Sequence, residues 1–341
     1  MKLLKISGYF DYLREGEEES GEEERDFSEQ KCLEVLQNLQ MEQYEEIADI
    51  PMSALDDLFL EVIGGDKYIK MDPNQEQDVL DLFEECTVDK KVDLEMMAKV
   101  LGYLLRRDCS KKTALLVVDV QNDFISGSLA LKNSPANQDG EEIVEVVNNI
   151  LEEHPFDAVV YTTDWHPEDH CSFYTNVSKY PLHESSTVSA EEAKVLDKVV
   201  YDGDKPIEQV LWPPHCIQES EGAELHSELN VKEDSIRILK GTHPQIDSYS
   251  AFWDNGRSTQ TILFQEFIDR KITHVFVCGL ATDFCVAYTA FDSNTHGFQT
   301  FVIEDACRGV CDESIEGMKT KEKRNGIKII ESSDIKDIIE I

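Results

Sequence analysis

Basic residues are scarce in this sequence. Its 341 residues include 32 Lys and Arg against 70 Asp and Glu, which gives a formal net charge of −38. A surface with such an excess of negative charge repels the phosphates of nucleic acids and of anionic lipids. We therefore expect no nucleic-acid partner and no membrane partner.

Long apolar runs and paired cysteines are also lacking. No stretch approaches the roughly 18 apolar residues of a membrane span, and MKLLKIS is too short for the apolar core of a signal peptide. The nine cysteines are irregularly spaced without a CxxC pair, which argues against a disulfide framework and a cysteine-rich zinc module. We expect a cytoplasmic protein with reduced thiols, with the nucleus as the alternative location.

The composition divides the chain near residue 108. The acidic run EGEEESGEEER (15–25) is interpreted as a solvated loop or linker, because it cannot bury enough apolar surface to order itself. After it, apolar residues recur at three- and four-residue steps, which is typical of helices. The helices expected from this spacing cover 27–40, 53–63, 74–86 and 93–105. We predict a small all-α domain over 1–108 and a larger domain over 109–341.

The spacing of these helices resembles that of EF-hand domains. In the best register the calcium loop would run over Glu85–Met96. Lys90 then stands where the sharp turn requires Gly, and Met96 stands where a bidentate Glu should close the site. We therefore predict no tight calcium site. The alternatives are an acidic helical bundle and a degenerate EF-hand-like pair that makes contacts within the chain or with a protein partner.

From residue 113 onward, short β-branched runs alternate with helical segments. The expected strands cover 113–120, 156–164, 235–241, 273–279, 298–305 and 326–330. Helical patterns over 140–154 and 258–271 lie between them. Continuous apolar strands separated by helices are typical of a parallel sheet that is covered on both faces. The predicted fold class is an α/β three-layer sandwich with a mainly parallel sheet.

Reactive side chains occur where these strands end. The residues concerned are Asp119, the pair Asp164 and His166, Lys240, and Cys285, which follows a Gly-containing turn. Sites in open parallel sheets form outside the carboxyl ends of the strands. Each residue alone is often a turn residue, a solvated charge or a buried small hydrophobe. Their occurrence at successive strand ends predicts one common site.

These residue types suit acyl transfer from an amide. Cys285, at the first turn of an expected helix, would be a thiolate nucleophile favoured by the helix dipole. Asp119 can take the thiol proton and return it to the leaving group, and Lys240 favours both the thiolate and the ionised carboxylate. The backbone N–H groups of Cys285 and Ala281 could form an oxyanion hole. The chemistry predicted is hydrolysis through a thioester.

A second cluster is rich in imidazoles. In DWHPEDH, Asp164 and His166 are followed by His170, and His215 lies in the Pro-containing segment WPPHC. One carboxylate and two or three imidazoles suit a divalent ion, most of all Zn²⁺, with Mn and Fe as alternatives. Histidines near turns are often merely hydrogen-bonded, which is the structural alternative.

At these residues the sequence resembles the nicotinamidases of the isochorismatase-like cysteine hydrolases. The resemblance covers roughly residues 113–335. It rests on motifs in matching order: VVDVQNDF (117–124), DWHPEDH (164–170), WPPHC (212–216), LKG (239–241) followed by YSAF (249–252), and GLATDFC (279–285). Each motif is weak alone, and together they are specific.

The resemblance implies roles for individual residues. It implies a catalytic triad of Asp119, Lys240 and Cys285. The implied metal ligands are Asp164, His166 and His215, while His170 is a ligand in some relatives and lies behind the ligands in others. A cis peptide before Ala281 is also implied.

The substrate implied by the resemblance is nicotinamide, hydrolysed to nicotinate and ammonia in NAD salvage. Its ring nitrogen would point toward the metal. Phe124 and Trp212 match positions that sandwich the pyridine ring, and Tyr249 would line the same pocket. The alternative for these aromatics is plain core packing.

The sequence allows two rival functions. The rivals are an amidase of the same superfamily with a carbamoyl or ureido substrate, and a catalytically retired interaction protein. The presence of both complete clusters favours nicotinamide.

Residues 176–210 separate the two metal motifs and are longer than the corresponding segment of compact relatives. We expect them to form a lid-like excursion or a subunit contact, and in the second case the protein would be an oligomer.

Overall fold

The computed structural model describes residues 29–44, 50–51, 54–55, 57–59, 77, 79–80, 83, 87–88, 91–105, 111–203 and 206–340. The chain divides into two compact units. One unit comprises Met1–Lys112, Phe264–Thr273 and Asn294–Gln299, and the other comprises Thr113–Leu263, His274–Ser293 and Thr300–Ile341. The predicted domain boundary at 108/109 stays a prediction.

Two helices of the N-terminal unit are described over their full length. Helix α3 spans Glu29–Asn38 and is followed by a 3-10 helix over Met41–Gln43, and α6 spans Leu94–Leu105. They agree with the helices expected over 27–40 and 93–105. The acidic run and most of the two intervening helical segments lie outside the described residues.

Two short strands lie in the segment that a calcium loop would occupy. Strand β1 (Thr87–Val88) pairs antiparallel with β2 (Lys91–Val92). The Asp93 carboxylate then accepts the backbone N–H groups of Glu95 and Met96 at 3.0 and 3.1 Å, which caps the start of α6. The sequence predicted only helices in residues 1–108, so these two strands are a difference from that prediction. The described residues give no support to the resemblance to EF-hand domains.

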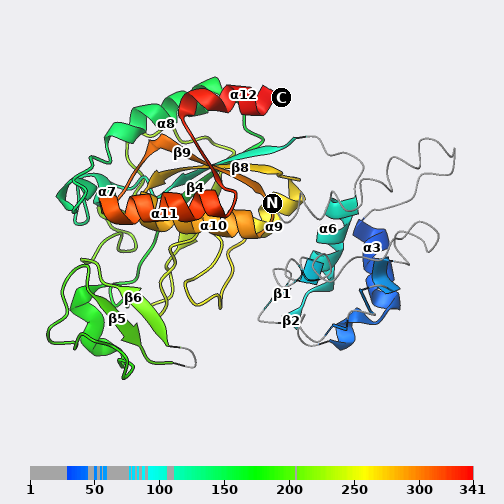
Figure 1. Ribbon diagram of the computed structural model, residues 1–341, viewed down its shortest axis with the longest axis horizontal. Coiled ribbons are helices and arrows are strands. Elements are labelled where there is room, and N and C mark those ends of the chain that lie inside the picture. The colour runs from blue at the N-terminus through cyan, green and yellow to red at the C-terminus, as the bar shows by residue number, and fades with distance from the viewer. Residues whose placement is uncertain are drawn as a thin grey trace. The chain divides into compact units, whose positions relative to one another are not determined.

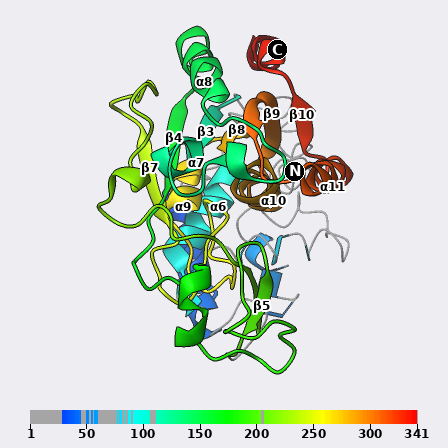
Figure 2. The same cartoon turned by 90° about the vertical axis from the view of Figure 1, so that its left-hand side faces the viewer.

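The larger unit is built on a six-stranded sheet (Figures 1 and 2). In spatial order its strands are β10 (Lys328–Ile330), β9 (Gln299–Arg308), β8 (His274–Leu280), β3 (Thr113–Val118), β4 (Ala158–Asp164) and β7 (Ile236–Lys240). The registers β10–β9, β8–β3, β3–β4 and β4–β7 are all parallel. Each strand coincides with one expected from the sequence.

Helices cover both faces of this sheet. Helices α8 (Glu142–Glu153) and α12 (Ile335–Glu340) lie on one face, and α10 (Ala287–Thr295) and α11 (Asp312–Arg324) lie on the other (Figure 1). The shorter helices are α7 (Asn122–Ile125), α9 (Leu263–Asp269) and 3-10 turns at Leu131–Asn133, Tyr174–Lys179, Glu221–Ala223 and Ser332–Asp334. All residues of the central strand β3 are buried, as expected for a strand with helices on both sides. The predicted α/β sandwich is confirmed.

The segment 176–210 forms a small substructure of its own. It contains a hairpin of β5 (Lys198–Tyr201) and β6 (Ile207–Val210), seen at the lower left of Figure 1. The hairpin packs around an apolar cluster of Cys171, Val177, Val199, Tyr201 and Leu211. Whether this excursion acts as a lid or a subunit contact stays a prediction.

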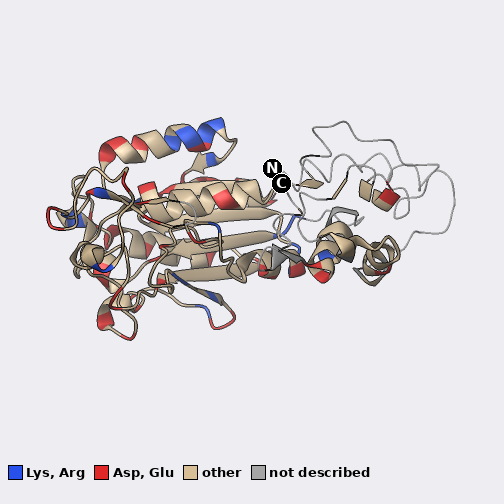
Figure 3. Cartoon of the chain, turned by 90° about the horizontal axis from the view of Figure 1, so that it is seen from below, with Lys and Arg blue, Asp and Glu red and all other residues tan. Residues whose placement is uncertain are grey.

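Acidic residues are distributed over many elements rather than gathered on one (Figure 3). In α11 the signs are separated along the helix: Asp312 and Glu313 lie in its first turn, and Lys321, Lys323 and Arg324 lie in its last. This order complements the helix dipole. In the described part of the chain, every helix is too short or too polar to cross a lipid bilayer.

The side chain of Glu322 on α11 is buried without a hydrogen-bond partner. It is 1% exposed, and within the described residues neither carboxylate oxygen accepts a hydrogen bond. Burial raises the pKa of this carboxyl from 4.5 to about 7. Since the folded chain then holds the proton more tightly than the unfolded chain, stability is lost as the pH rises from 4.5 through about 7.

We expect Glu322→Gln to stabilise the protein at pH 8 by about 1–3 kcal/mol and to change little at pH 5, because it removes a buried charge that forms only at the higher pH. Urea unfolding at both pH values measures this. Glu316→Gln, an exposed change on the same helix, is the control and should shift stability by less than about 0.5 kcal/mol. An equal gain at both pH values would contradict the titration.

Candidate active site

The carboxyl ends of four adjacent strands carry the predicted catalytic residues. Asp119 follows β3, and Asp164 and Lys240 are register partners at the ends of β4 and β7. Gly279 of β8 has a φ of 123°, and a Cβ there would lie 2.0 Å from the Val118 carbonyl oxygen. Because glycine has no Cβ, β8 can approach β3 at this point and start the turn to the cysteine beside Asp119.

Cys285 lies in a π-helical turn, Thr282–Val286, that leads into α10. The peptide between Leu280 and Ala281 is cis, as the sequence resemblance implies. In the same turn Asp283 is fully buried, and its carboxylate accepts the N–H of Val310 at 2.8 Å. The turn that holds the thiol is therefore tied to the segment between β9 and α11.

Lys240 is the centre of a buried charged cluster. Its Nζ lies 2.8 Å from Asp119 Oδ2 and 3.2 Å from Cys285 Sγ, and it forms a close ion pair with Asp164. Burial alone would lower the pKa of a lysine, but Asp119 and Asp164 hold the pKa of Lys240 well above its usual value. The predicted triad is thus brought together around one permanent positive charge.

The thiol of Cys285 holds its proton in this environment. Burial raises the pKa of Cys285 well above its usual value, and Asp119 and Asp164 raise it further, while Lys240 lowers it. The sequence predicted a thiolate, because a helix N-terminus and the ammonium of Lys240 both lower a thiol pKa. In the structure, burial and the two carboxylates raise the pKa of Cys285 by more than these groups lower it. The proton must therefore be taken by a base, and Asp119 is near enough, since one of its carboxylate oxygens lies within 4.8 Å of Cys285 Sγ.

Thr162 holds Asp119 in position, and the sequence reasoning missed it. Asp119 has a φ of 51°, in the left-handed region. The Thr162 hydroxyl donates to Asp119 Oδ1 at 2.6 Å and accepts the Asp119 N–H at 3.2 Å. A usable signal was present, since Thr162 lies two residues before Asp164 on β4 and so faces the same side of the sheet.

Asp164, His166 and His215 present ligand atoms to a common point. Asp164 Oδ2 lies 3.5 Å from His166 Nε2 and 3.7 Å from His215 Nε2. The Nδ1 atoms of the two histidines are bonded to the carbonyl oxygens of Gly241 and Pro213, each at 2.8 Å. These bonds orient both Nε2 atoms toward the carboxylate, which is the arrangement of metal-binding imidazoles. The three side chains fit a divalent ion.

His170 lies beside this set rather than in it. Its ring stacks on that of His166 with centroids 4.0 Å apart, and its Nδ1 bonds to the Ser172 hydroxyl at 2.7 Å. Burial lowers the pKa of His170 well below its usual value, so the ring is neutral. Its buried Nε2 has no hydrogen-bond partner in the described part of the chain. An unpaired imidazole nitrogen beside such a set supports the fit to a metal ion.

Two further side chains that sequence reasoning missed support the metal-site loops. The Gln121 amide accepts the Asp164 N–H and donates to the Asp164 carbonyl, both at 2.9 Å. The Asp123 carboxylate accepts the Cys216 N–H at 2.7 Å, next to His215. Both residues belong to the motif VVDVQNDF, where polar residues directly after an apolar strand were the available signal.

The aromatics expected to hold a ring line one cavity with Cys285. Phe124, Trp212 and Tyr249 are buried and border the same cavity as the metal-site residues. Sequence reasoning missed Phe284, whose ring meets those of Trp212 and Tyr249 with centroids 4.8 and 5.4 Å apart. The other apolar lining residues are Leu129, Leu131, Val310 and Ala281, which the sequence places in the oxyanion hole. Such a lining suits a flat apolar ring with one polar substituent.

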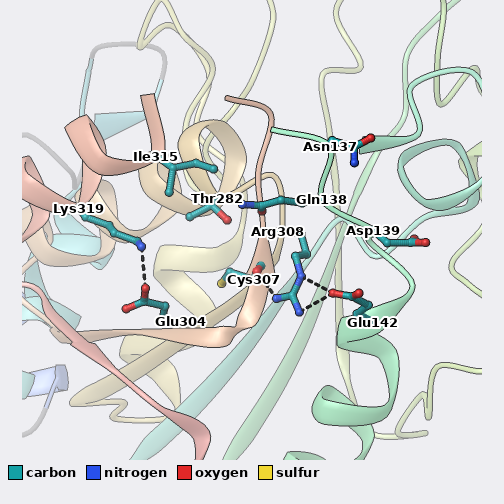
Figure 4. A pocket seen from close by; sticks show the side chains of 10 residues that line it. All are labelled: Asn137, Gln138, Asp139, Glu142, Thr282, Glu304, Cys307, Arg308, Ile315 and Lys319. Atoms are coloured by element: carbon teal, nitrogen blue, oxygen red, sulfur yellow. Dashed lines mark hydrogen bonds and ion pairs between the residues drawn. The ribbon is translucent and has the colours of Figure 1, made fainter. Parts of the chain in front are cut away.

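A second cavity, of about 440 Å³, borders the same turn through Thr282. Four of its charged residues form two ion pairs (Figure 4): Arg308 with Glu142 at 2.9 Å and Lys319 with Glu304 at 2.6 Å. Its described lining includes none of the catalytic or metal-site residues predicted from the sequence. The chemistry therefore belongs to the first cavity.

Comparisons with known proteins agree with this geometry. The sequence model of the isochorismatase domain matches residues 113–332. The nicotinamidase of Escherichia coli is 38% identical over 199 residues, which cover 58% of this chain and 83% of that protein. Among solved structures, a nicotinamidase/pyrazinamidase of Acinetobacter baumanii gives a TM-score of 0.56 at 38% identity and covers 67% of this chain and 100% of its own. PnC1 of L. infantum, solved in complex with nicotinate, gives a TM-score of 0.53 at 32% identity and covers 66% of this chain and 94% of its own.

We expect His215→Ala to lower the affinity for Zn²⁺ at least about tenfold, because it removes one of the converging ligand atoms. Competition with a chromogenic chelator measures the dissociation constant. His243→Ala is the control, since His243 is exposed and lies outside the cluster. Tight, stoichiometric Zn²⁺ in His215→Ala would show that the ligand assignment is wrong.

Proposed function

Because the chain belongs to the isochorismatase family, we propose that it hydrolyses nicotinamide to nicotinate and ammonia. One observation carries this: Lys240 contacts both Asp119 and the thiol of Cys285, and Cys285 lines a cavity together with aromatic rings and with Asp164, His166 and His215. A primary amide attached to a ring matches this cavity, because its amide can reach Cys285 while its ring lies among the aromatic side chains. The nicotinamidases similar to this chain, and the nicotinate bound to one of them, support the choice of substrate.

The first half of the reaction forms a thioester. Asp119 takes the proton of the Cys285 thiol as the sulfur attacks the carboxamide carbon and forms a C–S bond. The carbonyl oxygen becomes an oxyanion, which the backbone N–H groups of Ala281 and Cys285 are proposed to stabilise. Asp119 then gives its proton to the amide nitrogen, the C–N bond breaks, and ammonia leaves.

The second half hydrolyses the thioester. Water attacks the same carbon while Asp119 takes one of its protons, and the C–S bond breaks to release nicotinic acid, which keeps the other proton and loses it to solvent as nicotinate. The cysteine sulfur recovers its proton from Asp119. Throughout, Lys240 balances the negative charge that moves between the carboxylate and the sulfur, 2.8 and 3.2 Å away.

The metal ion is proposed to be Zn²⁺, held by Asp164, His166 and His215 with His170 beside them. A carboxylate and imidazoles are ligands that Zn²⁺ favours. When bound, the ion supplies a positive centre for the pyridine nitrogen of the substrate. Phe124, Trp212 and Tyr249 hold the ring in the same cavity.

Three further proposals rest on the sequence. The reaction serves NAD salvage in the cytoplasm, the acidic N-terminal residues contact a protein partner, and the segment 176–210 takes part in oligomer formation or active-site closure. The similar nicotinamidases support the role in NAD salvage. The acidic composition of residues 1–108 supports the protein partner, and the length of the segment supports its role in closure or oligomer formation.

Cys285→Ala should abolish ammonia release, with kcat lowered at least about 10³-fold, while nicotinamide still binds, because only the nucleophile is lost. Calorimetric titration measures binding, and a coupled ammonia assay measures turnover. Cys311→Ala, which removes a partly exposed thiol outside the cavity, should retain activity. Turnover by Cys285→Ala would overturn the mechanism. Inactivity of intact, metal-bound wild-type protein toward nicotinamide would redirect the search to carbamoyl or ureido amides.

Thr162→Val should lower kcat/KM about tenfold and shift its acidic limb to higher pH. The Thr162 hydroxyl lowers the pKa of Asp119, which burial raises. Without this donor the pKa rises further, so the base is protonated, and activity is lost, at a higher pH. The pH profile of kcat/KM tests this, with Thr163→Val on the opposite side of β4 as the control. An unshifted limb would show that Asp119 is not the titrating base.

A further inference from the structure

Asp247 is a buried carboxylate in the active-site cavity that the mechanism above does not use. It is 4% exposed and lines the cavity that contains Cys285. Its Oδ1 lies 4.0 Å from Nε2 of His170, the imidazole nitrogen without a hydrogen-bond partner in the described chain. Ligand atoms of His166, His170 and Asp247 all lie within 4.8 Å of one another. Asp247 therefore faces the same imidazoles that border the metal position.

The two sets of ligand atoms describe one metal position. His166 belongs to both, together with Asp164 and His215 in one and with His170 and Asp247 in the other. Its Nδ1 is occupied by the Gly241 carbonyl, so only Nε2 is free to bind a metal. One imidazole nitrogen binds one ion, so His170 and Asp247 adjoin the position at which Asp164, His166 and His215 converge.

The hydrogen-bond partners of Asp247 are neutral. Oδ2 accepts a hydrogen bond from Gln209 Nε2 at 2.8 Å, and Oδ1 accepts the backbone N–H of Ser248 at 2.8 Å. Neutral donors satisfy the oxygens but leave the charge of a buried carboxylate unbalanced. The nearby ammonium of Lys240 is already engaged by two other carboxylates. A divalent ion at the adjoining position would supply the missing positive charge.

Gln209 brings the segment 176–210 into the active site. It lies on β6, is 1% exposed, and donates to Asp247 Oδ2 and to the Val210 carbonyl, both at 2.8 Å, and to the Tyr249 hydroxyl at 3.3 Å. The hairpin that carries it has its own apolar cluster. A side chain on such a packed element can hold its partner in a set orientation.

We propose that Asp247 is a further carboxylate of the metal site, which stabilises the bound divalent ion by its charge, and that Gln209 is the positioning residue that holds it there. The inference rests on the proposed function only in requiring a divalent ion at this position. In this proposal the segment 176–210 helps to form the metal site through Gln209, although it is not part of the six-stranded sheet.

The test measures Zn²⁺ binding by the full chain after it has been stripped of metal. Asp247→Asn keeps the shape of the side chain and removes its charge, and its dissociation constant for Zn²⁺ should rise at least about tenfold. Asp254→Asn is the matched control, because Asp254 is a buried carboxylate of the same loop that bonds to Ser258 and Thr259 instead. Its dissociation constant should stay within about twofold of wild type. An unchanged Zn²⁺ affinity in Asp247→Asn would overturn the proposal. If this variant does not fold, Asp247→Ser replaces it.

A double-mutant cycle tests the role of Gln209. Gln209→Met removes the donor, and the Zn²⁺ affinity should fall several-fold in the wild-type background but not further in Asp247→Asn. Additive effects would show that Gln209 does not act through Asp247. Wild-type protein that bound Zn²⁺ but did not hydrolyse nicotinamide would overturn the proposed function alone. Wild-type protein that bound no divalent ion would overturn both the metal assignment and this inference.

Discussion

The buried ammonium of Lys240 is the constraint on which the active site depends. A lysine with no exposed side-chain surface stays charged only if anions surround it, and here Asp119 and Asp164 do so. The same charge lies 3.2 Å from the sulfur of Cys285. Removing Lys240 would leave the carboxylates of Asp119 and Asp164 buried without their common cation. Lys240 is therefore also a structural residue of this cluster.

Asp164 joins this cluster to the metal site. One of its oxygens pairs with Lys240, and the other faces the Nε2 atoms of His166 and His215. Burial alone would raise the pKa of Asp164, but Lys240 and His166 hold it well below its usual value. The carboxylate is thus ionised before any metal arrives, which favours binding of a cation. The thiol chemistry and the ion share one side chain.

The cavity is divided by polarity in a way that suits its proposed substrate. Charged and imidazole groups lie at the strand ends, while Phe124, Trp212 and Phe284 provide an apolar wall. An amide can reach the sulfur while its ring stays among the aromatic side chains. The excursion over 176–210 adds Gln209 and, through it, the position of Asp247. An element outside the sheet therefore contributes to the site that the sheet creates.

The sequence by itself determined the α/β sandwich, because apolar strands repeat between helices, and it predicted one common site from the reactive side chains at the strand ends. The tertiary structure decided the rest. Only folding shows that burial raises the pKa of Cys285 well above its usual value, since burial depends on distant segments. Thr162 has only its spacing from Asp164 as a local signal, and Asp247 has no local signature of function. Strand pairing places the Thr162 hydroxyl within hydrogen-bond reach of Asp119, and the hairpin places Gln209 within reach of Asp247. Contacts between residues so far apart in the sequence are not encoded in any short motif.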